Sequence, residues 1–124
     1  MREDKLGDLS TELSVEILQL TKDLHRKHET VISNQIGRSA TSICANIAES
    51  KYAHGRADFI AKLEIALKEA NETGKWLELL RKSDCIDEEK YKTLSRKCST
   101  IRFLLVKSVT TAKKNLTTTK ENAK

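Results

Sequence analysis

The chain has 124 residues and contains no proline, four glycines, 4% aromatic residues and 33% charged residues. This length predicts one domain, and the dominance of Ala, Leu, Ile, Glu and Lys, which are mostly good helix formers, predicts an all-α fold. No run approaches the roughly 20 apolar residues that a membrane span needs, and the charged N-terminus has no signal-peptide core, so we expect a cytoplasmic protein.

Apolar or small residues recur every three or four positions in four segments, which is the pattern of amphipathic helices. The first set is Leu6, Leu9, Leu13, Ile17, Leu20 and Leu24. The second set is Ile32, Ile36, Ala40, Ile43 and Ile47. The third set is Phe59, Leu63, Ala66, Ala70, Thr73, Leu77 and Leu80. The fourth set is Tyr91, Leu94, Cys98, Ile101, Leu105, Ser108 and Ala112.

Three polar segments separate these helices. Residues 25–30 carry no aliphatic side chain, Gly55 can end a helix or turn the chain, and Asp87 can cap the fourth helix. Loops this short place neighbouring helices antiparallel, so we predict an up-down-up-down antiparallel four-helix bundle over residues 1–115. The Thr-rich segment 116–124 is predicted to be a polar, frayed tail.

The second helix is unusual because most side chains from residue 38 to residue 48 are short. Its core stripe is flanked on one side by Gly37, Thr41, Cys44 and Ala48. Small flanks allow a neighbouring backbone to come close. One interpretation is tight packing within one bundle, and the other is that one flank is an interface between subunits. We also expect Arg38 to form a polar network with Asn46 and Glu49 that fixes helix register.

No motif for catalysis or cofactor binding is present, so we expect no enzyme activity and no cofactor. His25 and His28 face together but lie among cations, and the three cysteines match no metal spacing, so we expect no metal site. Trp76 and Phe103 are interpreted as core or interface anchors.

The segments QIGRSATSICANIAES and DFIAKLEIALKEANET resemble the bacterial four-helix bundle protein family. Its members include proteins encoded in intervening sequences of 23S ribosomal RNA genes, and a distant branch resembles the accessory variability proteins of diversity-generating retroelements. The motif positions that we interpret as structural or interface residues are Gln35, Arg38, Ser39, Ser42, Asn46, Glu49, Phe59 and Glu72. This chain departs from the pattern at Gly37, Cys44 and Ser50, where the family often has arginine, proline and glycine.

The resemblance implies a homo-oligomer, often a pentameric ring, without enzyme activity. For the retroelement relatives it implies binding of RNA and of a reverse transcriptase.

The net charge of +5 is unevenly distributed, because residues 1–95 carry a net charge of −2 and residues 96–124 carry +7. A basic segment of this kind predicts an anionic partner, with RNA the first candidate. The candidate contacts lie in the loop after the second helix and in the basic last helix: Lys51, Tyr52, His54, Arg56, Arg96, Lys97, Arg102, Lys107, Lys113 and Lys114. The alternative is a protein-interaction scaffold in which the basic segment is incidental.

Overall fold

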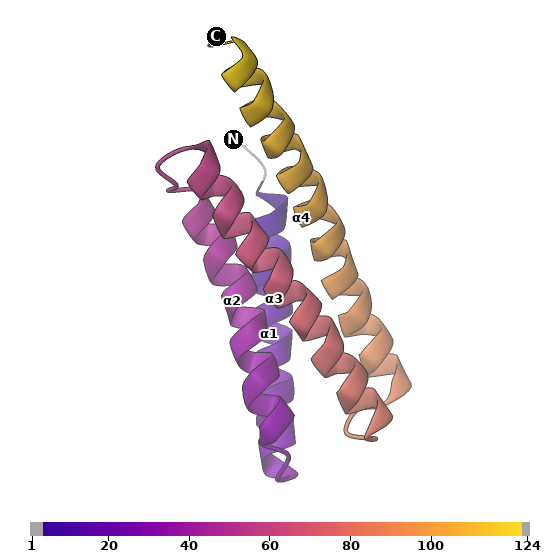
Figure 1. Ribbon diagram of the computed structural model, residues 1–124. Coiled ribbons are helices and arrows are strands. Elements are labelled where there is room, and N and C mark those ends of the chain that lie inside the picture. The colour runs from indigo at the N-terminus through magenta and orange to yellow at the C-terminus, as the bar shows by residue number, and fades with distance from the viewer. Residues whose placement is uncertain (1–3, 123–124) are drawn as a thin grey trace.

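The computed structural model describes the backbone of residues 4–122 and the side chains of residues 4–116. Four helices make up the described chain: α1 (Lys5–Arg26), α2 (Val31–Ser50), α3 (Arg56–Lys82) and α4 (Glu88–Asn122). They alternate in direction, as Figure 1 shows, and residues 4–122 include no strand. The predicted all-α, up-down-up-down bundle is confirmed.

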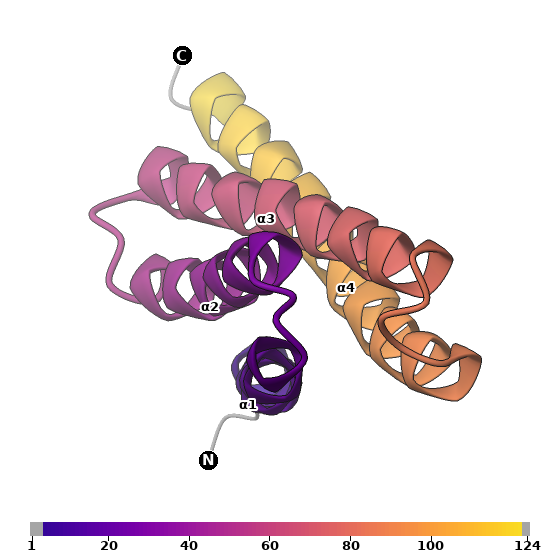
Figure 2. The same cartoon turned by 90° about the horizontal axis from the view of Figure 1, so that it is seen from below.

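Each helix packs against two neighbours. The contacts are α1 with α2, α2 with α3, α3 with α4, and α4 with α1, and the last of these is the least extensive. Figure 2 shows the result from one end, with α1 and α3 on opposite sides of the bundle. The helices also differ in length, because α4 has 35 residues and α2 has 20. At about 1.5 Å per residue, α4 is therefore about 22 Å longer than α2.

Local chemistry sets the helix boundaries. The Asp87 carboxylate accepts the Lys90 backbone N–H at 2.7 Å, which confirms the predicted cap of α4. The Asp4 carboxylate caps α1 by accepting the Gly7 N–H at 3.0 Å. The Glu29 carboxylate accepts the N–H groups of Ile32 and Ser33 at 3.1 and 3.0 Å, so it satisfies two unpaired donors at the start of α2.

The loops lie where the sequence predicts them, between residues 26 and 31, 50 and 56, and 82 and 88. Gly55 precedes the first residue of α3 in an extended conformation, so it starts a helix rather than ending one. The helix α4 continues to Asn122, past the predicted bundle end at residue 115. Residues 123 and 124 of the predicted tail lie outside the described residues, and fraying of the tail stays a prediction.

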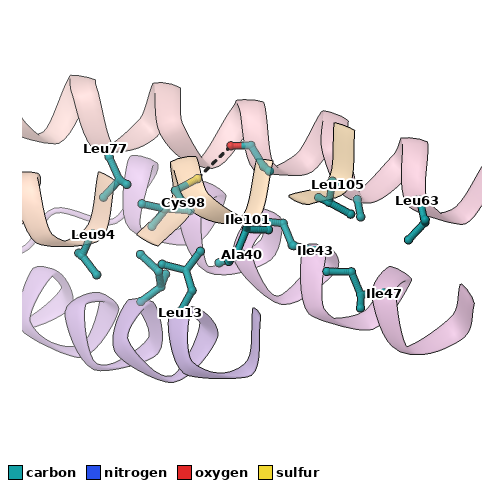
Figure 3. Packing of buried hydrophobic residues seen from close by; sticks show 14 of the residues in the cluster. Leu13, Ala40, Ile43, Ile47, Leu63, Leu77, Leu94, Cys98, Ile101 and Leu105 are labelled. Carbon is teal, nitrogen blue, oxygen red and sulfur yellow. Dashed lines mark hydrogen bonds between the residues drawn. The ribbon is translucent and has the colours of Figure 1, made fainter. Parts of the chain in front are cut away.

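The core lies on the predicted stripes. Figure 3 shows ten labelled core residues drawn from all four helices, including Ile43 and Ile47 of α2 opposite Leu63 of α3. Most members of the four sets are buried, and Leu6, Leu9, Ile32, Phe59 and Tyr91 pack partly buried against them. Three buried core residues lie outside the predicted sets: Ile60 next to the half-buried Phe59, Ile86 in the loop before α4, and Val109 next to the half-buried Ser108.

Candidate nucleic-acid interface

A line of side chains on α4 faces solvent and carries positive charge. It consists of Arg96, Phe103, Lys107 and Lys114, which we call the α4 stripe. The spacings of seven, four and seven residues place all four on one side of the helix. All four are exposed, and 63% of the Phe103 surface is accessible. At about 1.5 Å per residue, the stripe is about 27 Å long.

The cations of the α4 stripe lack acidic partners. Among the described side chains, no carboxylate oxygen lies within 4 Å of Arg96, Lys107 or Lys114. The Lys107 ammonium lies instead over the Phe103 ring, 5.4 Å from its centroid, in a cation–π contact. These charges are therefore available to an anion from outside the molecule.

Three other predicted contacts are occupied within the chain. Lys97 is bound to Glu12 and Glu16 of α1 at 2.7 Å, and these two hydrogen bonds raise the pKa of its ammonium. Lys113 pairs with Glu64 of α3 at 3.1 Å. Lys51 pairs with Asp4. The sequence predicts these three cations as nucleic-acid contacts, and that role stays a prediction; the structure adds that each has an acidic partner within the chain.

The loop after α2 lies at the same end of the bundle as the second half of α4 (Figure 1). Arg56 of this loop region and Lys107 line one shallow groove of about 440 Å³, together with Phe59 and Ser108. Tyr52 and His54 are exposed, and 83% of the Tyr52 surface is accessible. The structure therefore brings the loop region and the second half of α4 together at one end, whereas Arg96 and Lys97 lie in the first half of α4.

Arg102 lies apart from the α4 stripe, on the side of α4 that faces α3. It lines a polar groove of about 290 Å³ with Gly74 of α3 and Ser99 of α4. One of its guanidinium nitrogens lies 3.5 Å from the Ser99 hydroxyl oxygen. Among the predicted nucleic-acid contacts, Arg102 therefore lies at a location separate from the α4 stripe.

The family-motif residues lie mainly at the contact between α2 and α3. The Arg38 guanidinium donates from one nitrogen to Glu69 at 3.2 Å and from the other to Glu72 at 3.0 Å. Only 10% of the Glu69 side chain is exposed. Beside this clamp, the hydroxyls of Ser39 and Thr73 share a buried hydrogen bond of 2.7 Å.

The predicted network of Arg38 with Asn46 and Glu49 is wrong. Asn46 donates to the Ser42 carbonyl at 2.9 Å, and Glu49 pairs with Lys62 of α3 at 3.3 Å. Residues 38 and 46 are separated by about 12 Å along one helix, which is too far for a direct bond, so Arg38 binds across to α3. Of the remaining motif positions, Gln35 is exposed and Phe59 is half-buried.

Two of the four residues in the small-residue flank of α2, Gly37 and Cys44, lie against α1. A side-chain carbon added at Gly37 would lie 3.4 Å from Thr21 of α1, and the Cys44 sulfur lies 3.6 Å from the Thr11 hydroxyl. These contacts favour the interpretation of tight packing within one bundle. The opposite flank is used in the same way by Ser39, so short side chains serve both neighbours of α2.

The histidine and cysteine side chains were candidates for a metal site. His25 hydrogen-bonds Asn34 at 3.2 Å, and no group of three or more His, Cys, Asp or Glu side chains among the described residues is placed to hold a metal ion. Burial raises the pKa of the Cys98 thiol to about 11, so this thiol is neutral near pH 7. Phe103 is exposed rather than buried, which corrects its interpretation as a core anchor, whereas Trp76 packs partly buried against the core.

The described helices include none that combines the length and apolar character of a bilayer span. The protein is therefore a four-helix bundle whose last helix carries a row of exposed cations. Residues 3–107 match the model of the 23S rRNA-intervening sequence protein family, and the chain belongs to that family. No curated protein was found to be similar to the chain.

A solved structure supports the same assignment. It is the 1.70 Å crystal structure of a protein of unknown function from the S23 ribosomal protein family of Bacteroides thetaiotaomicron VPI-5482. This chain is 48% identical to it, with a TM-score of 0.82, and the match covers 84% of this chain and 97% of that chain. The resemblance inferred from the motif residues of α2 and α3 is therefore confirmed.

Proposed function

We propose that the protein is a non-enzymatic, RNA-associated accessory protein that binds the RNA backbone through the α4 stripe and the loop after α2. The observation that carries this proposal is the set of three exposed cations, Arg96, Lys107 and Lys114, with no acidic partner among the described side chains. Membership of the 23S rRNA-intervening sequence protein family supports RNA as the anion.

Binding of this kind reads the phosphate backbone rather than the bases. Lys and Arg on a straight helix face contact phosphates without distinguishing sequence, and each contact releases counterions. The exposed Phe103 ring adds a surface on which an unpaired base can stack. We therefore expect tolerance of sequence, a preference for RNA with unpaired segments, and a steep dependence of affinity on salt.

A homo-oligomer would repeat the α4 stripe and raise its affinity through effective concentration. The flank of α2 around Gly37 is unsuited to the interface, because it is packed against α1. Exposed apolar side chains offer a better surface, and they include Val31, Ile65 and Leu79 on α2 and α3. A ring with five subunits and a reverse transcriptase partner are expectations that come from family resemblance alone.

The test is a salt titration of binding to a structured RNA with single-stranded loops. The parent is compared with a variant in which Arg96, Lys107 and Lys114 are all replaced by Gln. Each lost phosphate contact lowers the slope of log affinity against log salt by roughly 0.7 to 0.9, so we expect a decrease of about 2 to 3. Light scattering on the same samples reports the subunit number.

The matched control replaces three cations of the other helices and loops, Lys22, Lys27 and Lys68, which also have no acidic partner among the described side chains. This control loses the same net charge but should keep most of the slope. Equal losses in both triple variants would show that only total charge matters and would contradict the α4 stripe. Absence of binding at about 50 mM salt would contradict the RNA proposal altogether.

The second candidate function, a protein-interaction scaffold, is favoured by one observation. Phe103 of the α4 stripe and Val106, three residues further along α4, are both exposed, at 63% and 48%. A partner that buries both side chains would gain from their burial without using the cations. Parent protein that binds no RNA but assembles through this surface would support that function instead.

A further inference from the structure

The groove between α3 and α4 has the composition of an anion site. Gly74 of α3 faces Ser95 and Ser99 of α4, and these three residues carry little or no side-chain bulk. The space that they leave is lined by hydroxyl and amide groups, with Tyr91 and Asn71 completing the polar wall. Its volume of about 290 Å³ lies at the lower limit for small-molecule sites, which suits a compact ligand.

Arg102 supplies the charge of this groove. Its guanidinium passes over Gly74, where an added side-chain carbon would lie 3.5 Å from one of its nitrogens. The other terminal nitrogen lies 3.5 Å from the Ser99 hydroxyl oxygen. Among the described side chains, no carboxylate oxygen lies within 4 Å of Arg102, so its guanidinium charge is not neutralised by an acidic partner there.

The other ionisable groups of the groove do not oppose an anion. Glu78 is bound by Lys75 at 3.4 Å and by Lys82 at 3.1 Å, so two cations surround its one negative charge. The Cys98 thiol donates a hydrogen bond to the Ala70 carbonyl at 3.3 Å, drawn as the dashed line in Figure 3, and it is neutral near pH 7. The local balance is therefore positive.

We propose that this groove binds a phosphate group, held by the Arg102 guanidinium and by the hydroxyls of Ser95 and Ser99. Arginine matches phosphate geometry with two parallel hydrogen bonds, and charge-assisted bonds of this type are stronger than neutral ones. Tyr91 and Asn71 also line the groove and can supply further hydrogen-bond donors.

The phosphate can belong to an RNA backbone or to a small phosphorylated molecule. The idea that the phosphate comes from RNA rests on the proposed function. The proposal that the groove binds phosphate does not depend on it. The groove also differs from the α4 stripe, because the stripe faces away from the bundle and Arg102 faces α3. The two sites can therefore be tested separately.

The first arm of the test uses inorganic phosphate, added at constant ionic strength and followed by NMR. We expect saturable shifts of the Gly74, Ser95 and Ser99 amides and of the Arg102 side-chain N–H. Loss of a charge-assisted bidentate contact corresponds to about tenfold or more in affinity, so Arg102→Gln should weaken binding by at least that factor. The matched control, Lys22→Gln, removes the same charge from α1, outside the groove and the α4 stripe, and should bind phosphate as the parent does.

A second variant protects the test against misfolding of the first. Ser95→Leu fills the groove while keeping Arg102, and it should also abolish binding. Parent protein whose groove amides do not respond to phosphate would overturn the proposal. So would equal phosphate binding by the parent and the Arg102→Gln variant.

The second arm distinguishes the two sources of phosphate. A single-stranded oligoribonucleotide that displaces inorganic phosphate from the groove would identify the RNA backbone as its ligand. If the oligonucleotide binds the α4 stripe and leaves phosphate in place, the ligand is a small phosphorylated molecule. If the salt titration shows no RNA binding but phosphate still binds the groove, the proposed function is contradicted and the phosphate site in the groove is supported.

Discussion

The α2–α3 and α1–α4 contacts are built from the same charge pattern with different outcomes. At the first, Arg38 of α2 lies between Glu69 and Glu72, which are one turn apart on α3. At the second, Lys97 of α4 lies between Glu12 and Glu16, which are one turn apart on α1. One cation therefore clamps two acids in both places.

The surroundings of the two clamps differ. Glu69 is 10% exposed and lies beside the buried hydroxyl pair of Ser39 and Thr73, whereas Glu12 is 55% exposed. A buried carboxylate that loses its partner keeps its desolvation penalty, but an exposed one regains water. We therefore expect the α2–α3 clamp to contribute more to stability than the α1–α4 clamp.

The largest expected effect is that of Arg38→Ala. It leaves the nearly buried Glu69 without its partner, so we expect the free energy of unfolding to fall by about 1 to 3 kcal/mol, discounted because Arg38 itself is half-exposed. Chemical denaturation monitored by circular dichroism measures the change. The matched control is Arg96→Ala on the exposed α4 stripe, which should change stability by less than about 0.5 kcal/mol. Equal effects of the two variants would show that Glu69 is not held by Arg38.

Exchanging arginine and lysine at the two clamps should have an intermediate effect on stability. Arg38 uses a separate nitrogen for each carboxylate, which the single ammonium of lysine cannot reproduce, so Arg38→Lys should cost about 1 kcal/mol. Lys97 reaches both acids from one nitrogen and is half-exposed, so Lys97→Arg should be close to neutral. Thermal unfolding of the two variants against the parent gives the comparison. A neutral Arg38→Lys variant would mean that charge, and not the fork of donors, holds the α2–α3 contact.

Among the variants that remove a charge, the smaller effect on the clamps is expected from Lys97→Gln, at about 0 to 1 kcal/mol for an exposed pair. Because the folded state raises the pKa of Lys97 above its ordinary 10.5, the stabilisation is fully present below pH 10.5 and is lost as pH rises through the folded value. The difference in unfolding free energy between parent and variant should therefore be constant from pH 7 to about pH 10 and decline above that. A difference that instead changes between pH 7 and pH 9 would contradict this assignment.

The sequence was sufficient to predict the helices and the core, because helical periodicity is a local property. Three buried core residues, Ile60, Ile86 and Val109, lie outside the predicted sets, and Val109 shows the limit of that signal. Leu105 is followed by Ser108 at a spacing of three and by Val109 at a spacing of four, and both spacings are helical. Only packing against the neighbouring helices decides between them, and it buries Val109.

The candidate interface was predictable only in part. Its location on α4 follows from the charge distribution, but the state of each cation depends on residues far away in the chain. Glu12 and Glu16 lie more than 80 positions from Lys97, so no local pattern could show that this lysine is occupied. The partners of Arg38 were missed for the same reason, since Glu69 meets it only after α2 and α3 pack together.

The length of α4 allows the stability of the fold and the affinity for anions to depend on different residues. Among the side chains whose surroundings the structure describes, the last core contacts of α4 are those of Ala112 and the partly buried Leu116, while the helix itself continues to Asn122. Mutations that alter charge at the exposed Lys107 and Lys114 therefore face little selection through folding and can accumulate under selection for ligand affinity. Evolution can thus adjust how strongly the protein attracts anions without altering the fold.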